Sequence, residues 1–135
     1  GLTFNGDTAA ANALDDYEEG NFTPTVNVGT ISSVGSYTKI GNTVTVWFSA
    51  TTFSETSSSS YITIGGLPFA GRNNMGNATC GSIMSRATDN LANQIYVEST
   101  SLTFYGNTTG GWDLLRFNDI NSSQFAMYGS ATYGV

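Results

Sequence analysis

The sequence contains no histidine and one cysteine, and only four of its 135 residues are basic. Without histidine, Ser-His-Asp and Cys-His catalytic arrangements and histidine metal sites are excluded. The single cysteine, Cys80, excludes a disulfide within the chain. It alternates with Ala78, Ser82 and Met84, which favours a small buried strand residue over a reactive thiol.

Positive charge is scarce and scattered along the chain. The net charge is −6, and the basic residues are Lys39, Arg72, Arg86 and Arg116. Because they form no basic stripe that could neutralise phosphates, we expect neither nucleic acid nor an anionic membrane surface as a partner. No apolar run approaches the roughly 18 residues of a membrane span, so no membrane insertion is expected. The remaining enzymatic option is a pair of carboxylates, as in glycosidases.

Carboxylates are concentrated near the start of the sequence. Four of the ten acidic residues lie within five positions: Asp15, Asp16, Glu18 and Glu19. We expect them in a connector over residues 1–20, made of an extended segment and a short helix, which precedes a domain over residues 21–135. In a connector, solvated or helix-capping roles fit better than a calcium site or catalysis. The sequence therefore predicts a non-enzymatic protein without a cofactor.

The composition and the hydrophobic pattern favour strands. Ser, Thr, Asn and Gly make up nearly half of the chain, which is a poor composition for helices. Alternating segments recur about every ten residues with turn signals between them. We expect strands at residues 22–28, 35–40, 43–53, 61–64, 78–85, 94–99, 102–105, 114–117 and 124–133, with the last one central. The predicted fold is an all-β, jelly-roll-like antiparallel β-sandwich.

Two motifs occur in a fixed order near the start of this domain. The run L-D-D-Y-E-E-G at residues 14–20 is followed by F-T-P-T at residues 22–25, and then by Y-T-K-I-G-N-T-V-T-V at residues 37–46. The pattern continues more loosely through G-L-P-F at residues 66–69 and G-S-A-T-Y at residues 129–133. In this the chain resembles the C-terminal heads of bacteriophage tail fibres and tail spikes, particularly of marine and environmental phages.

The resemblance implies a location, an assembly and partners. The chain would be a receptor-binding head in the tail of a virion, made in the cytoplasm of the bacterial host. It would form a homotrimer, broadly like the trimers of C1q or tumour necrosis factor, and adsorb to a host-surface glycan or protein beside other tail proteins. None of the motifs is catalytic, so the implied function is attachment.

Three loops are candidates for receptor binding. Asn107, Trp112 and Asp113 combine a flexible turn with an aromatic face and a carboxylate, a group that can stack on a sugar and accept hydrogen bonds from its hydroxyl groups. The alternative is that Trp112 starts a strand and packs into the core or a subunit seam. The other two loops pair arginine with amides or a carboxylate, as in adaptable polar recognition, although ordinary surface turns look the same. Their residues are Arg72, Asn73, Asn74, Arg86 and Asp89.

A subunit interface is expected on the rear faces of the strands and at the apolar last strand. The candidate residues there are Trp47, Tyr128 and Tyr133. An alternative function is a purely structural subunit of a fibre, head decoration or filament. In that case the extended segment containing Leu2 and Phe4 would add a strand to a neighbouring copy.

Overall fold

The computed structural model describes residues 6, 8–9, 16–72 and 81–135, and this part of the chain is all-β and antiparallel. The ten strands are β1 (Tyr17–Phe22), β2 (Thr25–Val26), β3 (Ser32–Ile40), β4 (Thr43–Thr51), β5 (Thr63–Gly65), β6 (Gly81–Arg86), β7 (Gln94–Glu98), β8 (Ser101–Thr108), β9 (Gly111–Leu114) and β10 (Ala126–Gly134). A 3-10 turn, η2 (Phe117–Asp119), precedes β10. The described residues contain no helix with the length and apolarity to cross a membrane.

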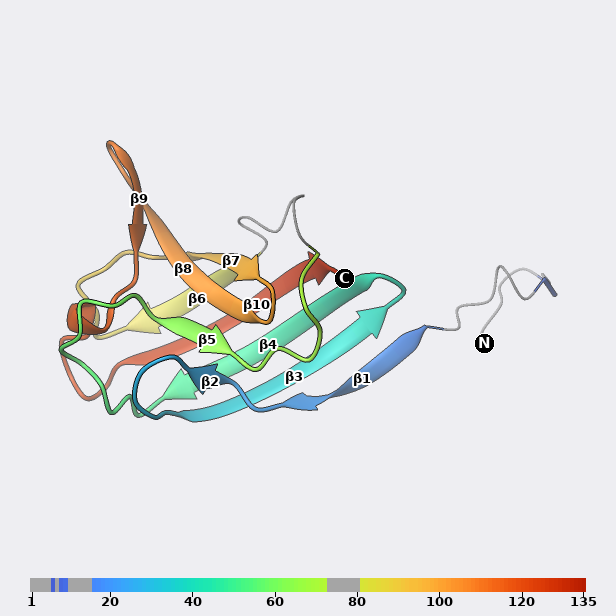
Figure 1. Ribbon diagram of the computed structural model, residues 1–135, viewed down its shortest axis with the longest axis horizontal. Coiled ribbons are helices and arrows are strands. Elements are labelled where there is room, and N and C mark those ends of the chain that lie inside the picture. Colours follow the sequence, from blue (N-terminus) through green and yellow to red (C-terminus); the bar gives the residue numbers. More distant parts are fainter. Residues whose placement is uncertain (1–5, 7, 10–15, 73–80) are drawn as a thin grey trace.

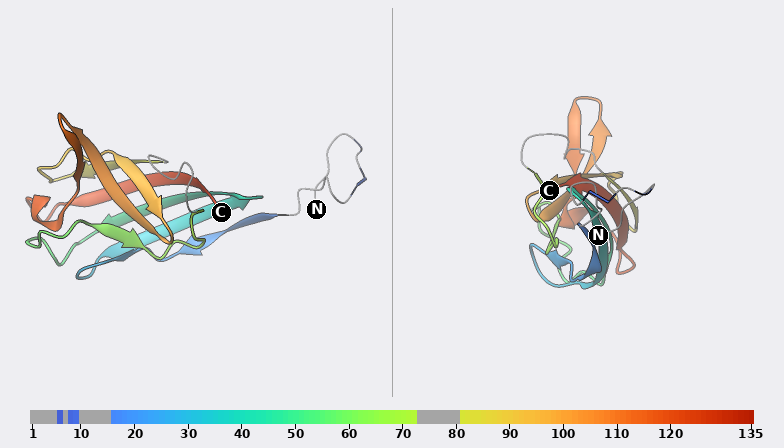
Figure 2. Two further views of the ribbon diagram at one scale, coloured as in Figure 1. Left: turned by 45° about the horizontal axis from the view of Figure 1, so that its top comes forward. Right: turned by 90° about the vertical axis from the view of Figure 1, so that its right-hand side faces the viewer.

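All ten strands belong to one curled sheet (Figures 1 and 2). Nine follow the order β1-β3-β4-β10-β6-β7-β8-β5-β2, and β9 pairs with β8. The two ends of this order, β1 and β2, are consecutive in the chain and are separated only by Thr23 and the buried Pro24. Because proline has no N–H for a ladder hydrogen bond, the chain leaves one partner strand there and joins another. The curled sheet therefore nearly meets itself at Pro24.

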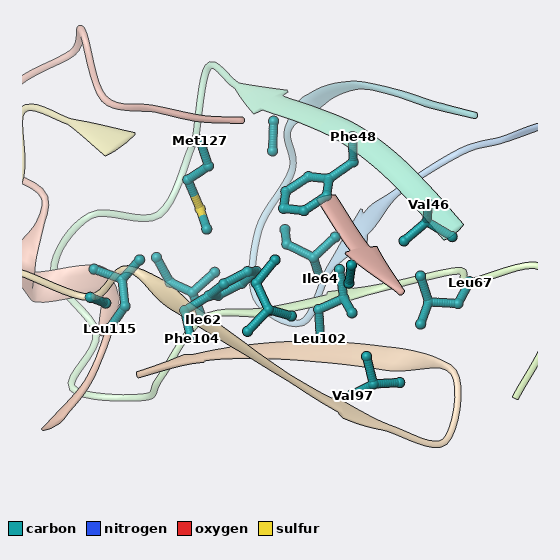
Figure 3. Packing of buried hydrophobic residues seen from close by; sticks show 14 of the residues in the cluster. Val46, Phe48, Ile62, Ile64, Leu67, Val97, Leu102, Phe104, Leu115 and Met127 are labelled. Carbon is teal, nitrogen blue, oxygen red and sulfur yellow. The ribbon is translucent and has the colours of Figure 1, made fainter. Parts of the chain in front are cut away.

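The core fills the inside of the curl. Alternation along β4 buries Val44, Val46, Phe48 and Ala50 and leaves the residues between them on the outside. Figure 3 shows Val46 and Phe48 on β4 on one side of the core and Leu102 and Phe104 on β8 on the other. Burial of an aliphatic or aromatic side chain of this size contributes about 1.5–3 kcal/mol. The two walls of the sheet are thus held together by a shared apolar interior.

The predicted all-β, antiparallel class is confirmed. So is the central position of the last strand, since β10 lies between β4 and β6. Gly41, whose φ of 59° suits glycine, lies in the turn between β3 and β4. The predicted strand at residues 22–28 is wrong, because Pro24 splits it into the end of β1 and the short β2. The strand predicted at residues 114–117 is displaced: β9 ends at Leu114, and Phe117 begins η2.

The boundary near residue 21 stays a prediction, but the sheet begins before it. Strand β1 starts at Tyr17 and pairs with β3 over its whole length, so the last four residues of the predicted connector belong to the sheet. Most of the predicted short helix, together with Cys80, lies outside the described residues.

Candidate functional site

The most exposed large aromatic side chain of the described residues is on a projecting hairpin. Strands β8 and β9 form this hairpin, which stands clear of the rest of the sheet (Figures 1 and 2). Trp112 lies on β9 with 79% of its surface exposed. The alternative prediction that Trp112 packs into the core of this chain is therefore wrong. A tryptophan left this accessible on a single chain offers a large apolar contact surface to a partner.

Trp112 continues a line of rings across three strands. The centroids of Trp112 and Tyr105 are 6.2 Å apart at an interplanar angle of 74°. Tyr105 and Tyr96 on β7 are likewise 6.2 Å apart, at 79°. We call these three residues the aromatic stripe. Both contacts are edge-to-face, the geometry that aromatic quadrupoles favour.

Strand alternation explains why the rings share one face. On β8, Leu102 and Phe104 point into the core, so Tyr105 points outward. In the pairing register, Gln94 is opposite Tyr105 and Asn107 is opposite Trp112. Residues directly opposite each other in a ladder point to the same side of the sheet. Two amides therefore accompany the aromatic stripe, and one of them, Asn107, was predicted.

Asp113 does not belong to this face. It follows Trp112 and so points to the other side of the hairpin, where its Oδ2 accepts a hydrogen bond of 3.0 Å from Nδ2 of the buried Asn90. Its Oδ1 lies 3.5 Å from the guanidinium of Arg116. The sequence predicted that Trp112 and Asp113 would contact the same ligand. The structure places them on opposite faces of β9, because neighbouring residues of a strand point to opposite sides.

Asn90 anchors the base of the hairpin. Besides Asp113, its Nδ2 lies 3.1 Å from the carbonyl oxygen of Leu114 and 3.2 Å from Oδ2 of Asp119, and its Oδ1 accepts the backbone N–H of Ala92 at 2.7 Å. Asp119 also accepts the backbone N–H of Arg116 at 2.8 Å. In this network the carboxylates of Asp113 and Asp119 are both bound to neighbouring groups of the chain.

The other predicted binding loops are not gathered around Trp112. Arg72 donates to the carbonyl oxygen of Val135 at 2.9 Å, and Arg86 donates to that of Gln124 at 2.9 Å. Asp89 accepts a hydrogen bond of 2.8 Å from the amide of Asn121. Asn73 and Asn74 lie outside the described residues. The described loop residues thus hold neighbouring segments in place at separate positions of the fold.

The acidic run is divided between the two faces of β1. Glu18 accepts a 2.5 Å hydrogen bond from Tyr37, whose pKa is raised by it, whereas Glu19 accepts one of 2.8 Å from Tyr17, with the same effect on its pKa. Asp16 forms an ion pair with Lys39, and Asp15 lies outside the described residues. Within the described part of the chain, no three acidic or cysteine side chains are grouped as a metal site would need.

A second exposed feature is an apolar row on the outer face of β3, β4, β10 and β6. Val34, Tyr128 and Met84 fall in one line of the pairing register, Val34–Ser49–Tyr128–Met84, and are 70%, 40% and 69% exposed. Trp47 lies two residues from Ser49 on the same face and is 47% exposed. Shallow grooves of about 380 and 220 Å³ flank Trp47. We call these four apolar residues the apolar row.

The remaining interface candidates have other locations. Tyr133 is only 3% exposed, and its hydroxyl donates to the carbonyl oxygen of Phe69 at 3.0 Å. It is therefore a core residue of this chain and offers no surface to a partner. Leu2 and Phe4 lie outside the described residues.

Four residues of these two surfaces were not anticipated from the sequence: Tyr96, Tyr105, Val34 and Met84. The sequence signal that could have indicated them is the two-residue period of a strand, because each of them points away from the face that its core-facing neighbours in the same strand occupy. What was missing was the strand register that brings them beside Trp112, Trp47 and Tyr128. No known protein family, curated protein or solved structure matches this chain.

Proposed function

We propose that this chain is a non-catalytic attachment module, the head of a bacteriophage tail fibre that binds a glycan on the host surface. The observation that carries the proposal is Trp112, 79% exposed on a projecting hairpin. Covering an exposed aromatic ring lowers the free energy of the complex, and sugars present apolar ring faces that suit such stacking. The tail-fibre identity is supported by the sequence motifs alone.

The absence of histidine supports attachment without catalysis. The carboxylates near the hairpin also favour it. Asp113 and Asp119 are bound to Asn90 and to groups of Arg116, so neither is poised as a general acid or base beside the exposed rings. Binding through aromatic contacts requires no such group.

We propose that the apolar row is covered by a second copy of this chain, in the homotrimer that the resemblance to tail fibres implies. Strand alternation along β3, β4 and β10 places mainly Ser and Thr around the row, and the charged residues Arg86 of β6 and Glu19 of β1 lie at its margins. Copies that each carry a net charge of −6 repel one another least through a face that carries one charge of each sign, both at its margins. Side chains of one copy could enter the grooves beside Trp47 of the next. Three copies would also multiply weak glycan contacts.

The finer architecture belongs to the same proposal. In a jelly-roll sandwich, β1, β3, β4, β10 and β6 would form one layer, and β7, β8, β5 and β2 the other. The apolar row would then lie on the outside of the first layer and the aromatic stripe on the outside of the second. Assembly and recognition would use opposite faces, so neither would block the other.

Trp112→Ala tests the attachment function. Fluorescently labelled protein would be incubated with a panel of bacterial strains, and bound fluorescence would be measured by flow cytometry. We expect the wild type to bind at least one strain and the variant to lose about tenfold in affinity, typical for removal of a stacking aromatic anchor. Leu91→Ala is the control, because Leu91 is 89% exposed but lies outside the aromatic stripe. Equal binding by all three proteins would refute the proposal.

A further inference from the structure

We propose that the whole aromatic stripe, and not Trp112 alone, is the recognition surface, and that its ligand is an extended, uncharged oligosaccharide. The inference rests on the proposed attachment function and adds the ligand class and three further residues, Gln94, Tyr96 and Tyr105. Four observations on the hairpin and its neighbours support it.

The first observation is the length of the stripe. Successive ring centroids are 6.2 Å apart, and the three rings come from three adjacent strands. One ring supplies one stacking position, whereas a line of three supplies several in sequence. A ligand that used the whole line would have to be a chain of sugars crossing β7, β8 and β9, not a single sugar.

The second observation is the pair of amides beside the rings. Gln94 is opposite Tyr105 and Asn107 is opposite Trp112 in the ladder. An amide has both donors and acceptors, so it can bind sugar hydroxyl groups in either direction. Neither side chain makes a hydrogen bond within the described part of the chain, which leaves this capacity open to a ligand.

The third observation is the charge of the face. Alternation places Gln94, Tyr96 and Glu98 of β7, Ser101, Tyr105 and Asn107 of β8, and Trp112 and Leu114 of β9 on the outside, whereas Thr103 on the same face of β8 is buried. Glu98 is the single residue of this set that is charged at neutral pH, and these three strands are described in full. Without a cation on the face, and with a chain of net charge −6, sialylated or phosphorylated glycans would be repelled. Uncharged sugars are the class that remains.

The fourth observation is the rigid support beneath the rings. Asn90 ties the reverse side of the hairpin to the η2 turn through Asp113 and Asp119. The ring-to-ring contacts restrain the side chains on the outer side. A surface that is already ordered loses less conformational entropy on binding, which improves affinity for a weakly interacting sugar chain.

The test is an immobilised glycan array with the full chain, followed by calorimetric titration. The array would include cellohexaose, chitohexaose and maltohexaose, their monosaccharides, and sialylated and phosphorylated glycans. We expect binding to neutral oligosaccharides longer than a disaccharide. Tyr96→Ala and Trp112→Ala should each weaken it by about five- to tenfold. Tyr61→Ala is the matched control, because Tyr61 is a partly exposed tyrosine outside the stripe.

The outcomes separate this inference from the attachment function. If Trp112→Ala reduces binding to bacterial cells while Tyr96→Ala changes neither cell nor glycan binding, attachment stands and the extended stripe is rejected. A silent array combined with Trp112-dependent cell binding would mean a protein receptor and would also overturn the inference. So would binding to acidic glycans only. If Trp112→Ala binds both cells and glycans as well as the wild type does, the proposed function itself is rejected.

Discussion

At the scale of single residues, one carboxylate holds the polar loop between β4 and β5 together. Glu55 Oε1 accepts backbone hydrogen bonds from Ser57 at 2.8 Å and Ser58 at 2.7 Å, and a third bond from the Ser57 hydroxyl at 3.0 Å. These donors favour the ionised form, so the pKa of Glu55 is lowered, chiefly by the backbone N–H of Ser57. The loop is thus ordered by a charge rather than by apolar burial.

Glu55→Gln should lower the melting temperature at about pH 7, because the neutral amide accepts these hydrogen bonds less strongly. The folded-state pKa of Glu55 is depressed, so its contribution is complete above the unfolded-state value of about 4.3 and disappears as the pH falls through the folded-state pKa. The difference between variant and wild type should therefore shrink towards about pH 3. Calorimetry across this range measures it.

Glu98→Gln is the control for this experiment. Glu98 is exposed at the end of β7, and its side chain accepts no hydrogen bond within the described part of the chain. A difference between Glu55→Gln and wild type that stayed constant from neutral to acidic pH would contradict the assigned role.

At the scale of elements, the β8–β9 hairpin shows how a local network positions an exposed surface. The outward orientation of Trp112 depends on the opposite face of β9, where Asn90 binds Asp113. Asn90 is buried and serves three acceptors on two segments, Asp113 and Leu114 near the hairpin and Asp119 in η2. The direction in which the hairpin projects is therefore decided by a residue that no ligand would touch.

Asn90→Ala should reduce the free energy of unfolding by about 1–3 kcal/mol, because three partly buried acceptors lose their shared donor and the buried backbone N–H of Ala92 loses its acceptor. Urea denaturation followed by tryptophan fluorescence measures this. Hydrogen exchange in β9 should rise as well, since the anchor at its base is gone. Asn121→Ala is the control: its amide is exposed and makes a single side-chain bond, to Asp89. Equal effects of the two substitutions would show that Asn90 is not the anchor.

At the scale of the whole molecule, the two outer faces of the sheet differ in character. The face of β3, β4, β10 and β6 carries the apolar row in a setting rich in Ser and Thr, whereas the face of β7, β8 and β9 carries the aromatic stripe with amides. A contiguous exposed apolar cluster is the usual mark of an interaction surface. We assign the first face to self-assembly and the second to the receptor.

Met84→Lys tests the assembly. A lysine in each copy would place unpaired charges in the proposed interface, and the loss of water around them would disfavour association. We expect light scattering to show a trimer for the wild type and a monomer for the variant at micromolar concentration. The melting temperature of the variant should fall only by the amount that trimer formation adds to the stability of the wild type, because Met84 lies outside the core.

Leu91→Lys provides the comparison, because it makes the same change at an exposed apolar residue away from the apolar row. This variant should remain trimeric. A monomeric wild type, or a trimer that survives Met84→Lys, would rule out the apolar row as the interface.

The sequence by itself determined the class of fold and the positions of most strands. Alternation with β-branched and aromatic residues, turn residues such as Gly41 and the scarcity of helix formers are local properties, and each acts within a few residues. The same local rules placed the last strand in the centre, because β10 is too apolar to lie at an edge. Composition also limited the chemistry, since a chain without histidine lacks the commonest general base.

Only the tertiary structure decided which side of each strand meets solvent and which distant residues lie together. Trp112 and Tyr133 are both large aromatic residues on strands, yet one is 79% exposed and the other 3%. The period of two divides a strand into two faces but does not say which face the opposite wall will cover. That depends on long-range register, which sets Tyr96 beside Tyr105 and aligns Val34 with Tyr128 and Met84. The aromatic stripe and the apolar row exist only because the sheet curls and pairs in this one order.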